Sequence, residues 1–283
     1  MDIKILVAHH KESLLIKNDI FMPIHVGKDI SNINLEILGD NTGDNISKKN
    51  SIYCEMTAIY WAWKNLNADY IGLCHYRRYF TFESKCLKDT IIEYLRYYRV
   101  RCIGNILNPG INYAKSSQLH ISDKNIFEYK AIIFSENIKK IIQKKQYDAI
   151  VPMPYYFACR NVRQFFEVLG REHISLLCDI VSDISPDLYP YLQKTFNSNK
   201  LYAANMFIMK SETYKDYCQT IFPILFEHEK RSLEKKWCND LINEKAYSRL
   251  SGYFGEILTS AYILKIITEN KNILSVNTMF YNI

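Results

Sequence analysis

The chain has 283 residues, of which 48% are hydrophobic and 23% charged, values that are ordinary for a soluble globular protein. This length allows one large domain with a sizeable core. The formal net charge of +6 at pH 7 permits contact with anionic lipid headgroups or sugar phosphates. It does not require nucleic acid, and the sequence contains no nucleic-acid-binding motif.

The eight cysteines and the lack of a long apolar run favour a cytoplasmic protein. No two cysteines form a CxxC pair, and several, such as Cys54 and Cys74, lie in apolar segments, as reduced buried side chains do. Asp2 and Lys4 argue against a signal peptide, and no stretch reaches the roughly 18 apolar residues of a membrane span. We therefore expect a cytoplasmic protein, soluble or peripheral at the inner face of the plasma membrane.

The first 80 residues show strand, loop, helix and strand patterns in turn. Strands are predicted over 3–8, 35–38 and 70–74. A polar loop rich in turn-forming residues follows the second strand over 39–47. A helix is predicted over 51–64, because apolar residues recur at helical spacing from Ile52 to Trp63. This order predicts an α/β domain with a mostly parallel sheet flanked by helices.

The rest of the chain is less regular. Helices are predicted over 87–101, 135–145, 162–182, 210–234 and 249–268, strands over 148–151 and 202–209, a loop-rich insertion over 105–123, and a short tail at the end. The sequence has no repeat, no low-complexity tract and no clear linker. We therefore expect a single domain with insertions.

The end of the third predicted strand carries the strongest functional signal. The apolar run 70–74 is followed directly by His75, Tyr76, Arg77 and Arg78. In open α/β sheets, ligands bind beyond the carboxyl ends of the strands, and the planar guanidinium group suits phosphate oxygens. The motif therefore indicates an anionic, phosphorylated ligand, with a solvated basic loop as the alternative.

Two other loops should reach the same edge of the sheet. His9, His10 and Lys11 follow the first strand and suit phosphate or base contacts, or a plain surface role. A joint metal site is not expected there, because neighbouring histidines on a loop point in different directions. Asp40 and Asp44 follow the second strand, where they either shape turns through Asx hydrogen bonds or accept bonds from a ribose or an amide edge.

Two polar residues in the C-terminal part are further candidates. Asn205 interrupts the apolar run 202–209 and needs hydrogen-bond partners if it is buried, so it is either structural or a ligand of sugar hydroxyls. Glu256 follows Gly255 near a predicted helix start, where the helix dipole favours a carboxylate. It is either a helix-start charge or a general base in a cleft.

Several common nucleotide-binding motifs are absent. The sequence contains neither GxxxxGK[ST] nor GxGxxG. It also lacks an Asp-x-Asp after the third strand, where metal-dependent nucleotide-sugar transferases usually hold a divalent ion. Residues 75–78 take that position here, and fixed positive charge can stabilise a leaving diphosphate without a metal.

Four blocks of sequence, 39–65, 69–80 (which contains HYRRYF), 147–154 and 205–209, resemble a family of bacterial glycosyltransferases. Their genes lie in capsule, exopolysaccharide and O-antigen loci, and their domain was long catalogued as of unknown function. The likeness extends over nearly the whole chain. It implies a GT-A-like, Rossmann-like fold over 1–283, with a nucleotide-binding half at 1–80 and an acceptor-facing half at 81–283. Some members of this family transfer galactose, including galactofuranose, from UDP-sugars.

The resemblance also implies roles for individual residues. Uridine and phosphate would lie near Ala8, His9, His10 and Lys11, and the nucleoside would also lie near Asp40, Asp44 and Asn45. The diphosphate would lie near His75, Arg77 and Arg78. The sugars would lie near Asn205 and Glu256. Family members commonly carry a basic residue after the glutamate of the last helix, whereas this chain has Ile257.

Together, the residues and the resemblance predict a metal-independent hexosyltransferase with Glu256, Arg77 and Arg78 in catalysis. It would need no cofactor and would move a hexosyl group, galactose in pyranose or furanose form, from a UDP-sugar to a lipid-linked glycan. The alternative is a non-catalytic subunit that binds a nucleotide-sugar or a glycan within a polysaccharide assembly complex. Release of UDP from donor and acceptor distinguishes the two.

Overall fold

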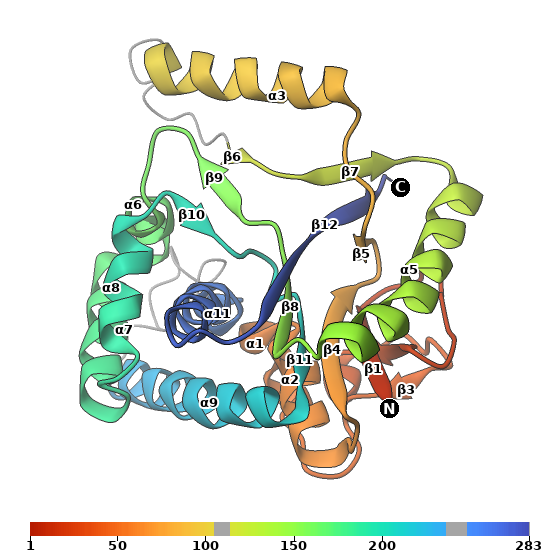
Figure 1. The fold of residues 1–283 in the computed structure, drawn as a ribbon. Helices are drawn as coiled ribbons and strands as arrows, with labels where there is room; N and C mark the ends of the chain where they lie inside the picture. Colours follow the sequence, from red (N-terminus) through yellow and green to blue (C-terminus); the bar gives the residue numbers. More distant parts are fainter. Residues whose placement is uncertain (105–113, 236–247, 283) are drawn as a thin grey trace.

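The computed structural model describes residues 1–104, 114–235 and 248–282, and its centre is a mixed sheet (Figure 1). One arm of this sheet has the order β3-β2-β1-β4, and all of its strands are parallel. These strands are β1 (Ile3–His9), β2 (Phe21–His25), β3 (Leu38–Gly39) and β4 (Tyr70–His75). The parallel arm brings the carboxyl ends of β1 and β4 side by side, with Ala8 opposite His75.

The other arm of the sheet curls into a closed ring. Its strands are β5 (Arg78–Thr81), β12 (Ile273–Tyr281), β8 (Ala149–Pro152) and β11 (Phe207–Lys210), with β7 (Gln118–Ile121) paired to β12. Because β11 pairs with both β8 and β4, the strands β4, β5, β12, β8 and β11 close a five-stranded ring. The pairs β4–β5, β5–β12, β8–β11 and β4–β11 are antiparallel. The fold is therefore mixed α/β, and the expected mostly parallel, Rossmann-like sheet describes only the first arm.

Helices cover both faces of the sheet and enclose two apolar cores. On one face α11 (Leu250–Thr268) is surrounded by the other helices of that layer (Figure 1). Those helices are α1 (Asn50–Tyr53), α2 (Met56–Asn65), α6 (Val162–Phe166), α7 (Arg171–Ile184), α8 (Tyr189–Asn197) and α9 (Ser211–Glu234). On the other face lies α5 (Lys124–Lys145), which buries Phe127, Phe134 and Ile138.

The remaining elements are short or lie at the rim. A small antiparallel sheet joins β10 (Lys200–Leu201), β9 (Tyr155–Phe157) and β6 (Ala114–Lys115). Single turns occur at Lys28–Ile30, Ser47–Lys49, Val100–Gly104 and Glu167–Leu169. Helix α3 (Leu87–Arg99) stands at one end of the molecule (Figure 1). None of the helices described is long and apolar enough to cross a membrane.

Most predicted elements occur, but three were wrong in ways that bear on the site. The predicted helix 51–64 is two helices, broken at Cys54, whose φ is 49°. The predicted strand 202–209 begins only at Phe207, because Ala204 and Asn205 take left-handed φ values of 67° and 50°. The expected C-terminal tail is strand β12, which pairs with β5, β7 and β8.

Other differences are smaller. The predicted strand 35–38 is only the two-residue β3, whereas β2, with Pro23 at its centre, was not predicted. The predicted helix 135–145 begins earlier, at Lys124, and residues 114–121 of the predicted loop contain β6 and β7. Residues 105–113 of that loop lie outside the described residues. The seven cysteines that the structure describes are free thiols, as predicted, and Cys238 lies outside the described residues.

Candidate functional site

A polar cleft of about 520 Å³ lies at the carboxyl ends of β1 and β4. Residues from the first 80 positions line most of it, and three residues of the C-terminal part complete it. The lining residues are Ala8, His10 and Val26, then Asn50, Ser51, Cys54 and Glu55, then His75, Tyr76, Arg77 and Arg78, and finally Ala204, Arg249 and Glu256. The cleft therefore combines three guanidinium groups with two carboxylates, and it lies at the sheet edge where the sequence predicted a site.

The basic motif forms a tight hairpin on the floor of this cleft. His75 ends β4, Arg78 begins β5, and Tyr76 and Arg77 form the turn between them. Phe280 of β12 supports both arginines, with its ring centroid 4.9 Å from Arg77 Cζ and 5.5 Å from Arg78 Cζ. Arg78 Nε is buried and has no hydrogen-bond partner among the described residues. Because a buried charged donor without a partner is costly, Arg78 is placed to receive an anionic ligand.

The acidic side of the cleft is formed by Glu256 and Glu55. Glu256 lies in the second turn of α11, beyond the first turn where the helix dipole acts, so the interpretation as a helix-start charge was wrong. Burial, and then the nearby Glu55 carboxylate, raise the pKa of Glu256 to about 7. The Ala204 amide, Arg78 and Arg249 act in the opposite direction. A carboxyl group with a pKa near 7 can take up a proton at neutral pH, as a general base must.

Two glycines of α11 allow the carboxylates to approach each other. A Cβ on Gly255 would lie 2.7 Å from Met56 Sδ and 3.0 Å from Asn205 Oδ1. A Cβ on Gly252 would lie 3.1 Å from Cys54 Sγ. Glycine at both positions therefore lets α11 pack closely against the break between α1 and α2, which is where Glu55 lies.

The strained turn at Ala204 and Asn205 holds both sides of the cleft. His75 Nε2 lies 2.7 Å from the Ala204 carbonyl oxygen, so Nε2 carries the hydrogen in this bond. Asn205 Nδ2 donates to Glu55 Oε1 at 2.8 Å and to the Gly252 carbonyl at 3.1 Å. Cys54 and Arg249, both cleft-lining, also have positive φ values. Such strain persists only where the surrounding structure enforces it, and it gathers at functional sites.

The histidines of the cleft are neutral at pH 7. Burial, followed by the positive charge of Lys11, lowers the pKa of His10. Burial also lowers the pKa of His75, and Glu55 offsets only part of that effect. The positive charge of the cleft therefore comes from its guanidinium groups.

Of the residues proposed from sequence, Ala8, His10, His75, Arg77, Arg78 and Glu256 line the cleft. Asn205 lies behind it and is fully buried, with Glu55 as its partner. His9 is also fully buried, and its Nδ1 bonds Ser13 Oγ at 2.8 Å. Lys11 lies beside the cleft, 5.5 Å from the Tyr76 ring centroid.

The three residues of the 39–47 loop that were proposed from the sequence, Asp40, Asp44 and Asn45, lie outside the cleft. Asp40 is fully buried and accepts hydrogen bonds from the Gly27 and Lys28 amides and from the Ser47 and Thr57 hydroxyls. The Asp44 carboxylate accepts from Tyr60 Oη at 3.1 Å. Asn45 bonds within its own turn, to the Gly43 carbonyl and the Ser47 amide. In this arrangement all three shape the loop.

Sequence reasoning missed Glu55 and Arg249, and a local signal is lacking for both. Glu55 borders the apolar stripe of the predicted helix 51–64, three residues after Ile52, and the break that turns it into the cleft contains neither Gly nor Pro. Arg249 was placed at the start of the last helix, but nothing in the sequence indicates its φ of 100°. Within the described ranges, no group of three or more His, Cys, Asp or Glu side chains could hold a metal ion.

Comparison with solved structures finds a similar protein whose name states an activity. The apo structure of WbbM, a bifunctional glycosyltransferase, matches with a TM-score of 0.78 and 25% sequence identity. The match covers 100% of this chain and 46% of that one, so the chain spans less than half of the protein it resembles. No curated protein sequence matches. A family model described as "domain of unknown function (DUF4422)" matches residues 4–269, and the chain belongs to this family.

Proposed function

We propose that the protein is a glycosyltransferase that binds a nucleoside diphosphate sugar in the cleft at β1 and β4. The observation that carries this proposal is the pairing, within one cleft, of Arg78, with its buried and unpartnered Nε, and Glu256, whose pKa is raised to about 7. The first group suits a diphosphate and the second suits a hydroxyl that must lose its proton. The likeness to a bifunctional glycosyltransferase supports this reaction class.

In this proposal the acidic side of the cleft accepts a proton from the acceptor, and the basic side stabilises the leaving diphosphate. Glu256 takes the proton of the acceptor hydroxyl as its oxygen forms a bond to the anomeric carbon of the donor sugar. The bond between that carbon and the phosphate oxygen breaks, and the nucleoside diphosphate leaves with both electrons of the bond. Arg77 and Arg78 stabilise the charge that develops on the diphosphate. Glu55 acts through Glu256, because its negative charge helps to raise the pKa of that base.

The resemblance to bacterial glycosyltransferases limits the range of donors and acceptors that we propose. We propose a UDP-hexose donor, with galactose in pyranose or furanose form, and a lipid-linked glycan acceptor. Ala8 and His10 are placed to contact the nucleoside, since both line the cleft beside the hairpin. We further propose that the arginines make a divalent metal unnecessary for donor binding.

The alternative is a subunit that binds the nucleotide-sugar without transferring it. The position of Glu256 favours the enzyme, because a binding module gains nothing from a carboxylate with a pKa near 7 facing the same cleft as the arginines.

Two measurements on the purified protein test the proposal. Calorimetric titration of UDP in the presence of EDTA should show binding, and adding manganese should not strengthen it. UDP release should then be followed with a panel of UDP-hexoses and an extract of lipid-linked glycans. Binding without release under every condition would favour the non-catalytic subunit, and loss of UDP binding in EDTA that manganese restores would contradict metal independence.

A further inference from the structure

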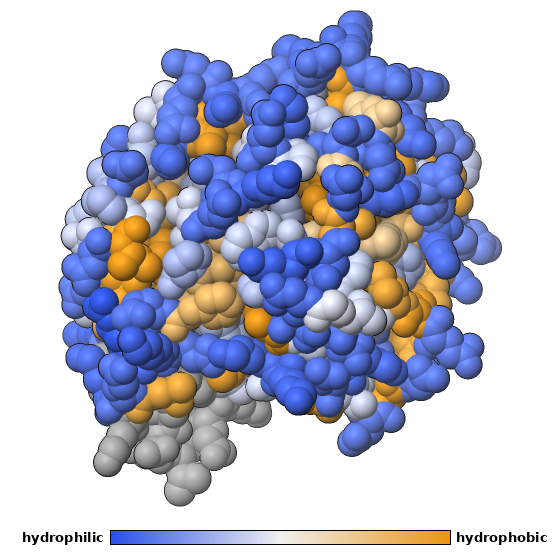
Figure 2. Space-filling model, turned by 90° about the horizontal axis from the view of Figure 1, so that it is seen from below, coloured by the Kyte–Doolittle hydropathy of each residue, from blue (hydrophilic) through white to orange (hydrophobic). Residues whose placement is uncertain are grey.

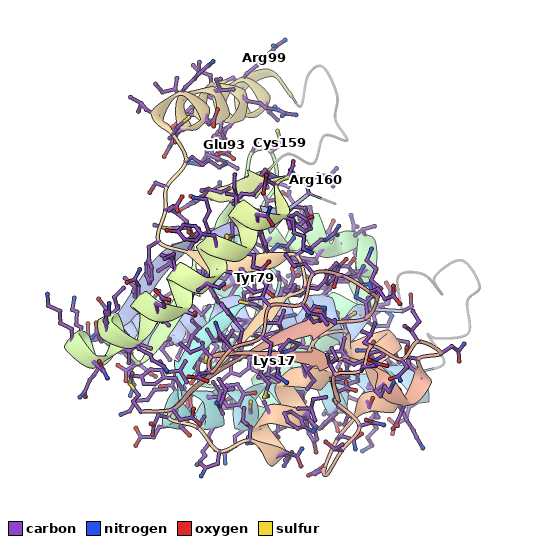
Figure 3. The ribbon with its side chains drawn as sticks, turned by 90° about the vertical axis from the view of Figure 1, so that its right-hand side faces the viewer. Lys17, Tyr79, Glu93, Arg99, Cys159 and Arg160 are labelled. Atoms are coloured by element: carbon purple, nitrogen blue, oxygen red, sulfur yellow. The ribbon has the colours of Figure 1, made fainter. Side chains whose placement is uncertain are left out.

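Helix α3 (Leu87–Arg99) attaches to the molecule along one side only. It lies at one end of the protein, away from the helices that cover the sheet (Figures 1 and 3). Its inner side holds Tyr97, which is 7% exposed and donates to the Phe157 carbonyl at 3.4 Å. The inner carboxylate of Glu93 accepts from Lys85 Nζ at 2.6 Å and from the Ser116 amide at 3.0 Å.

The outer side of α3 carries a row of large apolar residues. Leu87, Ile91, Leu95 and Tyr98 recur at helical spacing, and they are 75%, 49%, 67% and 55% exposed. Tyr94, next to this row, is 45% exposed, and Lys115 of β6 covers one face of its ring, with Nζ 3.5 Å from the ring centroid. We call these five residues the α3 stripe. The opposite end of the molecule, seen in Figure 2, is mostly hydrophilic, with apolar residues in separate small patches. The stripe therefore needs an explanation that scattered surface residues do not.

The charges around the stripe distinguish between the surfaces that could cover it. At 3.6 residues per turn, Lys88 and Arg99 lie about 100–120° around the axis from Leu87, beside the stripe, and the 52% exposed Ile92 lies just beyond them at about 140°. Asp89 and Glu93 lie about 200–240° around, toward the body of the protein. Figure 3 shows the same separation, with Arg99 on the side of α3 away from the body and Glu93 on the side toward it. The outward surface of α3 is thus apolar with two cations, Lys88 and Arg99, beside the stripe, while the exposed Asp89 lies toward the body of the protein.

We propose that α3 docks the protein on an anionic lipid bilayer. An apolar face with a cationic border and tyrosines beside it is the pattern of helices that lie in the headgroup region of a membrane. The stripe would be buried among the acyl-chain ends, while Lys88 and Arg99 meet lipid phosphates. A second copy of this chain fits less well, since symmetric contact through one helix would bring the cationic borders of two molecules, each with a net charge of +6, together. The proposal concerns a surface outside the cleft and does not depend on the proposed activity.

Flotation with vesicles tests this proposal directly. The protein should bind vesicles of phosphatidylcholine and phosphatidylglycerol, and bind vesicles of phosphatidylcholine alone far more weakly. The Ile91→Ser/Leu95→Ser variant should lose about a hundredfold in partitioning, because it removes two buried apolar side chains. The Lys88→Gln/Arg99→Gln variant should lose about twentyfold on the anionic vesicles.

A matched control makes the outcome specific to α3. Ile30→Ser/Ile184→Ser alters two apolar residues of similar exposure, 51% and 45%, on other elements, and it should bind like the wild type. Since the positions altered on α3 are exposed, circular dichroism and melting temperature should match the wild type for every variant. Absence of binding to the anionic vesicles, or equal loss in the control, would overturn the proposal. The proposal would also be overturned if light scattering showed that the protein is a dimer and that Ile91→Ser/Leu95→Ser converts it to a monomer. In that case a second copy of the chain would cover the stripe.

Discussion

Two regions of this protein contain a carboxylate that is buried or partly buried, and they differ in the hydrogen bonds and charges around that group. Asp40 accepts four hydrogen bonds, from two backbone amides and two hydroxyls. Glu256, only partly exposed, faces a second carboxylate, and its pKa is raised to about 7. Both residues were candidates from the sequence. The structure separates them, because a saturated carboxylate stabilises a loop, whereas a carboxylate held near its point of protonation is suited to move a proton.

The same contrast applies to the cations. Lys49, on the surface, pairs with Glu229 at 2.7 Å. Arg78, in the cleft, is supported by Phe280 and leaves its Nε without a partner among the described residues. Of the residues with a buried polar atom that lacks a partner among the described residues, Arg78 is the one that lines the cleft.

The largest expected effect follows replacement of the proposed base. Glu256→Gln keeps the shape of the side chain but removes its capacity to accept a proton. We expect turnover to fall by about 10²–10⁴-fold, the usual contribution of a general base, with UDP affinity preserved. Steady-state rates and calorimetry measure the two quantities. Asp44→Asn, a carboxylate outside the cleft, serves as the control, and normal turnover in Glu256→Gln would rule out the base role.

The second effect should appear in stability. Asp40→Asn exchanges one acceptor oxygen for a donor and so leaves buried donors without a partner. We expect the free energy of unfolding to drop by about 2–4 kcal/mol, measured by urea denaturation. A loss below about 1 kcal/mol would contradict this structural role, and normal stability combined with weak UDP binding would place Asp40 in ligand binding instead.

The third effect concerns donor affinity. Arg78→Gln should weaken UDP binding about ten- to hundredfold, because it removes a charge-assisted contact from a partly buried site. Arg77→Gln should have a smaller effect, as it lies in the turn and its guanidinium also stacks on Tyr76. Arg171→Gln is a matched control, since that side chain is 82% exposed and outside the cleft. Unchanged affinity in both cleft variants would contradict the assignment of the diphosphate to the hairpin.

The smallest effect is a pH dependence of stability. Because the pKa of Glu256 is raised in the folded state, that state retains the proton between about pH 4.5 and 7 while the unfolded state has lost it. The contribution of Glu256 to stability is therefore fully present below about pH 4.5 and is lost as the pH rises toward 7. Denaturation curves of Glu256→Gln and wild type should diverge over this range, with the variant more stable at pH 8 by about 1–2 kcal/mol. Parallel curves would contradict the raised pKa.

The sequence predicted the basic side of the cleft better than the acidic side. Strands β1 and β4 follow from local apolar runs, so the positions of His10, His75, Arg77 and Arg78 could be inferred from strand ends alone. The position of Glu55 depends on the break at Cys54, which is set by the close approach of Gly252 from a helix that begins almost 200 residues later in the chain. Likewise, the ring of five strands depends on β12, a segment whose pairing is wholly long-range. Tertiary packing decides such features, and local patterns do not contain it.

The central claim is that burial and the Glu55 carboxylate raise the pKa of Glu256 to about 7, and that Glu256 acts as the base. The most direct test is the pH dependence of kcat/KM in the wild type and in Glu55→Gln. The wild-type rate should rise with pH through an apparent pKa of about 7, because the base must be deprotonated. Glu55→Gln removes the neighbouring negative charge, so the apparent pKa should move to lower pH. A profile that is flat from pH 5 to 9, or one that Glu55→Gln leaves in place, would contradict the account.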